Sequence, residues 1–268
     1  MNPKNRWAGF ILITFVLGVS LAAGVAELSS AAAPTPTSGP TILNIILPGM
    51  RAWWMAENNA NDSMGLYDGV LMNGVTFAPG KVGSAFSLDG SDDYIVIPNG
   101  VITATARNFT VEAWIYLNAT DNQWHMMVYG GSDAGEYHLA LDELNRFNFG
   151  VKLVDWNWYN VTAPAITDTW VHLAAVRRGT SIELWVDGVL ADSVAIPDLD
   201  LYAAGNEMNN ARIGAYNEFF TQHKDFWDGL LDEISLYDQA LSAGEILAIY
   251  QADSAGKGYR ILLPLLVE

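Results

Sequence analysis

Phe109-Thr-Val-Glu-Ala-Trp-Ile-Tyr-Leu117 is the stretch of the sequence that decides the fold class. Apolar residues occupy every second position from Phe109 to Leu117, and Glu112, Trp114 and Tyr116 lie between them. Successive side chains of a strand point to opposite faces of its sheet, so one face of this segment is entirely apolar. The stretch therefore predicts a β-strand with one face in a core and the other over a second surface.

The segments that follow extend the pattern to a sandwich. Residues 170–176 are apolar on both faces apart from His172, which predicts a central strand. Residues 182–186 alternate, and Asp187-Gly188 then predicts a tight hairpin, because a type I′ turn tolerates these two residues. From about 50 to 237, apolar runs are separated by Gly, Asn and Asp throughout. This texture predicts a single all-β domain with two antiparallel sheets.

The sandwich is expected to occupy residues 50–252 and to end in one short helix. Ser242 and Glu245 have the spacing of a capping box, which predicts a helix directly after Ser242. Residues 34–49 are a spacer of Pro, Thr and Ser followed by an apolar stretch, and residues 253–268 form a C-terminal tail. The tail has two interpretations, docking on the sandwich or a sorting signal.

Residues 1–33 have the layout of a secretory signal. Lys4 and Arg6 precede an uncharged, mostly apolar stretch from Trp7 to Ala26, which small residues follow. Cleavage after Ala26 is the first interpretation. The alternative is an uncleaved N-terminal anchor, since a stretch of about 20 apolar residues is long enough to span a bilayer. Both interpretations predict a secreted or cell-surface protein.

The composition limits the partners. The sequence has 30 acidic and 13 basic residues and a net charge of −17, so nucleic acid and anionic membranes are not expected partners. A membrane contact is expected only through an uncleaved N-terminal segment. There are no cysteines, so disulfides and thiolate metal sites are excluded. The acidic side chains suit Ca²⁺, and they also keep an exported protein soluble.

Six groups of segments follow one another in an informative order. They are Arg51-Ala-Trp-Trp-Met-Ala-Glu57 with Asn61-Asp-Ser-Met-Gly65, Gly80-Lys-Val-Gly-Ser-Ala-Phe-Ser-Leu-Asp-Gly90 with Asp93-Tyr-Ile-Val-Ile-Pro98, residues 109–116, Trp170-Val-His-Leu-Ala174 with Leu184-Trp-Val-Asp-Gly188, Ala211-Arg-Ile-Gly214, and residues 229–242. In this order they resemble the laminin-G-like jelly-roll domains of the concanavalin A-like lectin/glucanase superfamily. The resemblance covers about residues 51–251 and implies a two-sheet antiparallel jelly roll. It says less about function, because one fold hosts many functions.

The resemblance also implies a structural Ca²⁺ site. Related sandwiches hold the ion between an acidic residue of the first strand, a backbone carbonyl, and an aspartate of the last strand. In this sequence the matching residues are Glu57, Gly90 and Asp232, with Asp62 and Asp92 as further candidates. Asp62 and Asp92 have a simpler explanation as turn residues that bond their own backbone. Asp232 also has a simpler explanation, as a charge at the edge of a strand.

No catalytic centre is expected. The resemblance implies that a glycosidase of this superfamily would carry a Glu-x-Asp-x-x-Glu strand, and the sequence has no such motif. Asp232 and Glu233 are adjacent, so on a regular strand they would point to opposite faces. The histidines lack metal-ligand spacing.

Aromatic and polar residues gather in segments expected to be loops or strand ends. Sugars present apolar faces and hydroxyl groups, so an aromatic ring beside an amide or a carboxylate suits them. The candidate ligand-binding residues are Trp124, Tyr137, Asp155, Trp156, Asn157, Trp158, Tyr159, Tyr216, Asn217 and Phe219. Trp156 and Trp158 have the same parity and are expected on one face, either as a platform or as an edge of the core.

The expected function is that of a secreted, non-catalytic carbohydrate-binding module stabilised by Ca²⁺. The first alternative is a cell-surface adhesion or protein-interaction domain that binds no sugar, because a protein-binding surface would carry the same aromatic residues. The second alternative is a diverged glycan-active enzyme, against which the missing acid pair argues.

Overall fold

The computed structural model describes residues 48–131, 135–203, 211–218 and 222–257. The predicted signal segment, most of the spacer and the end of the C-terminal tail lie outside these residues. Within these ranges the chain folds as two antiparallel sheets with one α-helix near residue 250. This is the architecture expected from the strand patterns.

Sheet A has eight strands, in the order β13-β12-β11-β6-β17-β4-β3, with β1 also paired to β17. Its strands are β1 (Met50–Trp54), β3 (Thr76–Pro79), β4 (Ser84–Asp89), β6 (Asn108–Leu117), β11 (Trp170–Arg178), β12 (Ser181–Val186), β13 (Val189–Ala195) and β17 (Asp228–Tyr237). The predicted central strand is β11, between β6 and β12. Asp187 and Gly188 both have positive φ in the turn that joins β12 to β13, as the hairpin pattern predicts.

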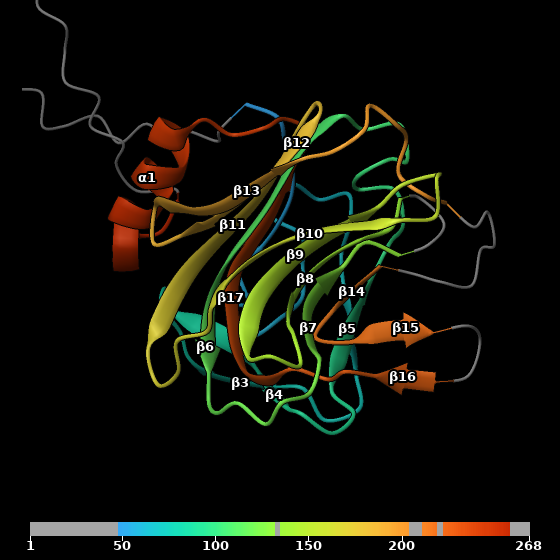
Figure 1. Cartoon of the computed structure of the whole chain (residues 1–268). Helices are drawn as coiled ribbons and strands as arrows, with labels where there is room; N and C mark the ends of the chain where they lie inside the picture. Colours follow the sequence, from blue (N-terminus) through green and yellow to red (C-terminus); the bar gives the residue numbers. More distant parts are fainter. Residues whose placement is uncertain (1–47, 132–134, 204–210, 219–221, 258–268) are drawn as a thin grey trace, which may run out of the picture. The chain divides into compact units, whose positions relative to one another are not determined.

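Sheet B has seven strands, in the order β10-β9-β8-β7-β14-β5-β2. Its strands are β2 (Val70–Met72), β5 (Tyr94–Ile97), β7 (His125–Tyr129), β8 (Tyr137–Leu141), β9 (Arg146–Lys152), β10 (Trp158–Pro164) and β14 (Ala211–Ile213). A separate hairpin joins β15 (Tyr216–Glu218) to β16 (Gln222–Lys224). Figure 1 shows this hairpin projecting on the opposite side of the view from the helix.

The core lies between the inner faces of the two sheets. Its β6 members are Phe109, Val111, Ala113, Ile115 and Leu117, and all five are fully buried. The alternation in β6 is therefore confirmed. Apolar residues of β8, β9 and β10 fill the opposite side of the core.

Residues 243–257 pack on the outer face of sheet A. The helix α1 (Ala243–Ala252) begins with the predicted capping box, since Ser242 and Glu245 cap each other's backbone amides. A 3₁₀ turn (Asp253–Ala255) follows, and Lys257 is buried against sheet A. The packed chain thus extends beyond the expected boundary at residue 252. We call residues 253–257 the strap.

No helix in the described part of the chain is long and apolar enough to cross a membrane.

One irregularity in β17 changes how its side chains are placed. The pairing of β17 with β6 shifts register between Asp232 and Ser235, and Glu233 has a φ of 53°. Such a bulge inserts an extra residue into the strand. Leu231 and Ile234 face the core, while Asp232 and Glu233 both lie outside it. The prediction that these two acids point to opposite faces is wrong, because it assumed a regular strand.

Candidate functional site

The outer face of sheet B carries polar side chains at alternate positions of three neighbouring strands. Residues 137, 139 and 141 of β8 face the core, and His138 faces outward between them. The register places His138 beside Gly150 of β9, and Gly150 beside Asn160 of β10. Asn148 of β9 lies two residue pairs further along, on the same face. The strand period therefore brings one imidazole and two amides together on a single face.

Gly150 forms the floor of this arrangement. A Cβ atom on Gly150 would lie only 2.5 Å from Cε1 of His138 and would also collide with the Asn160 amide. Glycine thus lets the two flanking side chains approach each other over the backbone of β9. The His138 Nε2 atom lies 3.0 Å from the Asn148 Oδ1 atom. Burial lowers the pKa of His138 to about 4, so its imidazole is neutral at physiological pH.

Aromatic rings border the imidazole on two sides. The ring centroids of Trp158 and His138 are 4.8 Å apart, and Trp124 meets His138 edge-on at 5.7 Å. Both tryptophans are only partly buried. Tyr216 packs edge-on against Tyr129 at 4.8 Å, and it shares a small apolar cluster with Trp124. The face is therefore walled by aromatic rings that remain accessible.

Two cavities follow this face and share Trp124 and Asn160. The first has a volume of about 380 Å³ and is lined by Trp124, Met126, His138, Trp158, Asn160, Tyr216, Lys224 and Asp225. The second has a volume of about 430 Å³ and is lined by Trp124, Asp142, Glu143, Leu144, Arg146, Asn148, Asn160 and Thr162. Because of the shared residues, we treat them as one feature and call it the sheet B groove.

Charged side chains at the groove are paired within the protein. Arg146 donates to the Asp142 carboxylate from Nε at 2.9 Å and from Nη2 at 2.7 Å. Burial opposes ionisation of Asp142, but the bonds from Arg146 and from backbone amides hold its pKa below the usual value. Lys152 lies 3.1 Å from the Glu136 carboxylate. The groove thus offers rings and amides next to cations that already have partners.

The sequence-predicted ligand residues divide into two groups. Trp124, Trp158 and Tyr216 line the groove. Trp156 does not share a strand with Trp158, because it lies in the turn before β10 with a φ of 69°. Its side chain is 67% exposed, and the Lys152 Nζ atom lies within 6 Å of both tryptophan ring centroids. Trp156 therefore stands beside the groove without lining it.

Tyr137 is placed differently from the prediction. It faces the core, and its ring centroid lies 5.1 Å from that of Phe109. Strand parity explains this, because Tyr137 precedes the outward-facing His138. Tyr159 packs partly on the core and donates its hydroxyl to Asp155. Asp155 also accepts two bonds from Asn157 and so is engaged within its own turn.

Two further candidates cannot be placed. The Asn217 side chain and the whole of Phe219 lie outside the described residues. In contrast, the sequence reasoning missed His138, Asn148 and Asn160 as site residues. Each is a polar residue at an outward position of a strand whose neighbouring positions are apolar, so a parity search through strands would have found them.

Two of the predicted metal ligands approach one turn. Glu57 accepts a bond from the Ser84 amide at 3.3 Å, and Asp232 accepts one from the Val82 amide at 2.9 Å. A Cβ atom on Gly80 would lie 2.6 Å from Asp232 Oδ2, which explains glycine at the start of this turn. The Asp232 Oδ1 atom is buried without a hydrogen-bond partner. Burial raises the pKa of Asp232 to about 7.

The other predicted ligands are not brought to this turn. Gly90 pairs with Trp227 and packs on Asp228, near the opposite end of the β4–β17 pairing, because β4 is extended between them. Asp62 is saturated, since its two oxygens accept four backbone amide bonds. Its role is to organise residues 62–67, which is the simpler explanation given above.

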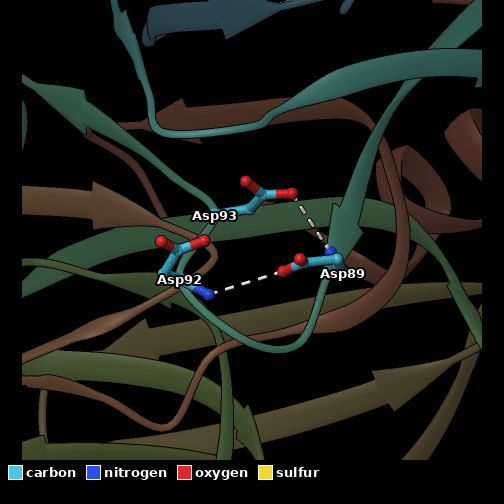
Figure 2. A group of neighbouring side chains, drawn as sticks. All are labelled: Asp89, Asp92 and Asp93. Carbon is cyan, nitrogen blue, oxygen red and sulfur yellow. Dashed lines mark hydrogen bonds between the residues drawn. The ribbon is translucent and has the colours of Figure 1, made fainter.

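Asp92 lies in a separate acidic cluster with Asp89 and Asp93, and Figure 2 shows the three carboxylates around the turn after β4. Asp89 accepts bonds from the Ser91 and Asp92 amides, and Asp93 accepts bonds from the Gly74 and Asp89 amides. Burial raises the pKa of Asp93, and the charges of Asp89 and Asp92 add to the effect. These bonds explain the cluster as turn structure.

Comparisons with known proteins agree with this architecture. The family described as the concanavalin A-like lectin/glucanases superfamily matches residues 89–247, which is more than half of the chain. A comparison with curated proteins finds no sequence match.

Solved structures of several binding domains resemble the chain. Domain 4 of AbnA, an extracellular GH43 arabinanase from Geobacillus stearothermophilus in complex with arabinotriose, has a TM-score of 0.57 and 20% identity, and the alignment covers 74% of this chain and 96% of that one. The binding domain of Paraclostridial Mosquitocidal Protein 1 has a TM-score of 0.61 and 12% identity over 76% of this chain and 52% of that one. The binding domain of Botulinum neurotoxin DC, in complex with rat synaptotagmin II, has a TM-score of 0.59 and 12% identity over 76% of this chain and 51% of that one. At these identities the likeness shows the fold alone.

Proposed function

Because the chain belongs to the concanavalin A-like lectin/glucanases superfamily, we propose that it is a non-catalytic module that binds a glycan in the sheet B groove. The observation that carries this proposal is the neutral His138 imidazole between Trp124 and Trp158, next to the Asn148 and Asn160 amides.

The groove has the chemistry that a sugar ring needs. Accessible tryptophan faces stack on the apolar C–H face of a pyranose or furanose, and the amides donate to and accept from its hydroxyls. The groove lining carries two bases, Arg146 and Lys224, against three acids, Asp142, Glu143 and Asp225, and Arg146 is paired with Asp142, so the lining has no excess of positive charge for an anionic sugar. We therefore propose an uncharged glycan, whose affinity would vary little with salt concentration.

The acids of sheet A support a non-catalytic role. Glu112 and Glu233 lie near each other, but both are almost completely buried. A general acid must reach the substrate within hydrogen-bonding distance. Carboxylates that are buried in this way are suited to stabilising the fold.

The test is a glycan array followed by titration calorimetry on the best binder. We expect Trp124→Ala to weaken binding at least tenfold, since this ring touches both halves of the groove. Trp170→Ala is the matched control, because Trp170 is a partly exposed tryptophan on sheet A. A silent array combined with tight binding of a purified extracellular protein would favour the adhesion alternative. Release of reducing sugar would favour the enzyme alternative.

We also propose a structural Ca²⁺ held by Glu57 and Asp232. The unpartnered Oδ1 of Asp232 supports this, because a buried carboxylate oxygen without a donor is what a hard cation can satisfy. Chelation should lower Tm, and Ca²⁺ at about 100 times its Kd should add about 2.7 kcal/mol of stability. An unchanged Tm on chelation would contradict the proposal.

Export is proposed from the N-terminal layout alone. Expression of the full chain, followed by N-terminal sequencing of the extracellular product, tests it. A product that begins directly after Ala26 would support a cleaved signal, and retention in the cytoplasm would contradict export.

A further inference from the structure

The outer face of sheet A holds a buried charged cluster that the groove does not use. Glu112 is fully buried on β6 and receives hydrogen bonds from His172 Nε2 at 3.0 Å and from the Tyr237 hydroxyl at 3.2 Å. Glu233, on the bulge of β17, accepts a bond from the Trp53 indole at 3.1 Å. Two carboxylates are thus fixed in place by donors from three different strands.

Lys257 of the strap places its ammonium group between these carboxylates. Its Nζ atom lies 2.8 Å from the Glu112 Oε1 atom and 3.8 Å from the Glu233 Oε2 atom. It also donates to the Ser235 hydroxyl at 2.7 Å and to the backbone carbonyl of Glu233. The Lys257 side chain is only 6% exposed.

The number and kind of acceptors match a primary ammonium group. Such a group has three N–H donors and no acceptor. The three acceptors here are a carboxylate oxygen of Glu112, the hydroxyl of Ser235 and the carbonyl of Glu233, and the Trp53 ring centroid lies 5.6 Å from Nζ. The bulge contributes to this set, because it interrupts the regular pairing between β17 and β6 at Glu233.

We propose that this cluster is a preformed binding pocket for a primary ammonium group, which Lys257 fills from within the same chain. Lys257 is the buried cation that ties the strap to sheet A, and the pocket accepts an external alkylammonium ion when the lysine side chain is removed. The chemical class of the ligand is therefore a small primary amine in its protonated form.

The test is chemical rescue of Lys257→Ala in the full chain. Removing Lys257 leaves buried carboxylates without their cation, so we expect Tm to fall by about 10 °C. n-Propylammonium replaces the atoms that the substitution removes. At ten times its Kd it should raise the Tm of the variant by about 4 °C. Tetramethylammonium at the same ionic strength has no N–H donor and should have no such effect.

Lys81→Ala is the matched control. Lys81 also binds the strap, through Asp253, but that carboxylate is 60% exposed. We expect a smaller loss of Tm and no specific effect of propylammonium.

Either of two results would overturn the proposal: a Lys257→Ala variant as stable as the original chain, or equal effects of the two ammonium ions. If the variant does not fold, the same two ions are compared during refolding, with near-ultraviolet circular dichroism as the readout. Recovery in propylammonium alone supports the pocket, and equal recovery or none refutes it.

Discussion

The outer faces of the two sheets carry similar residues, but one face is open and the other is covered. On sheet B, His138 lies against Trp124 and Trp158 and opens into a groove. On sheet A, His172 lies 5.3 Å from Trp114, and the helix α1 and the strap cover that face. Each face pairs an imidazole with a tryptophan and with a polar side chain of a neighbouring strand. The difference teaches that covering, and not residue type, decides whether such a face stays open or becomes part of the packed structure.

The largest expected effect is on the covered face. Glu112→Ala removes a partner of both Lys257 and His172, and it should lower the free energy of unfolding by about 3 to 5 kcal/mol, because the buried Lys257 cation keeps only the Glu233 carboxylate at 3.8 Å. Asp238→Ala breaks an exposed pair with Arg51 and should cost about 0.5 kcal/mol or less. Urea unfolding measures both. Equal losses of unfolding free energy in the two variants would contradict the expected difference between buried and exposed ion pairs on this sheet.

A pair of tryptophan substitutions tests the two faces against each other. Trp158→Ala should weaken glycan binding by about 2 kcal/mol, roughly 30-fold, with little change in stability. Trp114→Ala should destabilise the fold by about 3 kcal/mol and leave the affinity of the remaining folded protein unchanged. Calorimetric titration and urea unfolding are applied to both variants. If Trp114→Ala alone lost affinity, the assignment of the faces would be reversed.

Asp232 gives a pH-dependent effect on the covered face. Its folded pKa of about 7 lies above the unfolded value, so metal-free protein should lose stability as pH rises from about 4 to 7. Asp232→Asn removes that loss and should be more stable than the original chain at pH 8 by on the order of 2 kcal/mol in chelator. Ca²⁺ should stabilise the original chain and not the variant. The measurement is unfolding from pH 4 to 8, and parallel pH profiles for the two proteins would argue against a buried Asp232 charge.

The smallest effect concerns the open face. Burial keeps His138 neutral down to about pH 4, so glycan affinity should be constant between pH 5 and 8. Below about pH 4.5 protonation places a charge between the rings, and affinity should fall. Titrations at several pH values check this. A step in affinity near pH 6.5 would mean that the imidazole is exposed and titrates normally.

Part of the groove lining is predictable from short segments. The gathering of aromatic residues near strand ends points to Trp124, Trp158 and Tyr216, which line the groove. It points to Tyr137 as well, but the parity of β8 turns this residue toward Phe109. The family resemblance groups Gly90 with Asp232, but the length of β4 separates them. A regular strand predicts opposite faces for Asp232 and Glu233, because two adjacent acids carry no clear signal of a bulge.

The sequence by itself determined the fold class of this protein, the strand alternation of β6, the Asp187-Gly188 hairpin and the capping box of α1. These features depend on residues a few positions apart, so local periodicity and turn chemistry are sufficient to specify them. Only the tertiary structure decided which outer face is open. Lys257 reaches Glu112 from 145 positions away in the chain, and His138 of β8 is met by Trp124, just before β7, and by Trp158 of β10. Such contacts depend on how the whole chain packs, because burial and pairing are properties of the assembled sheets.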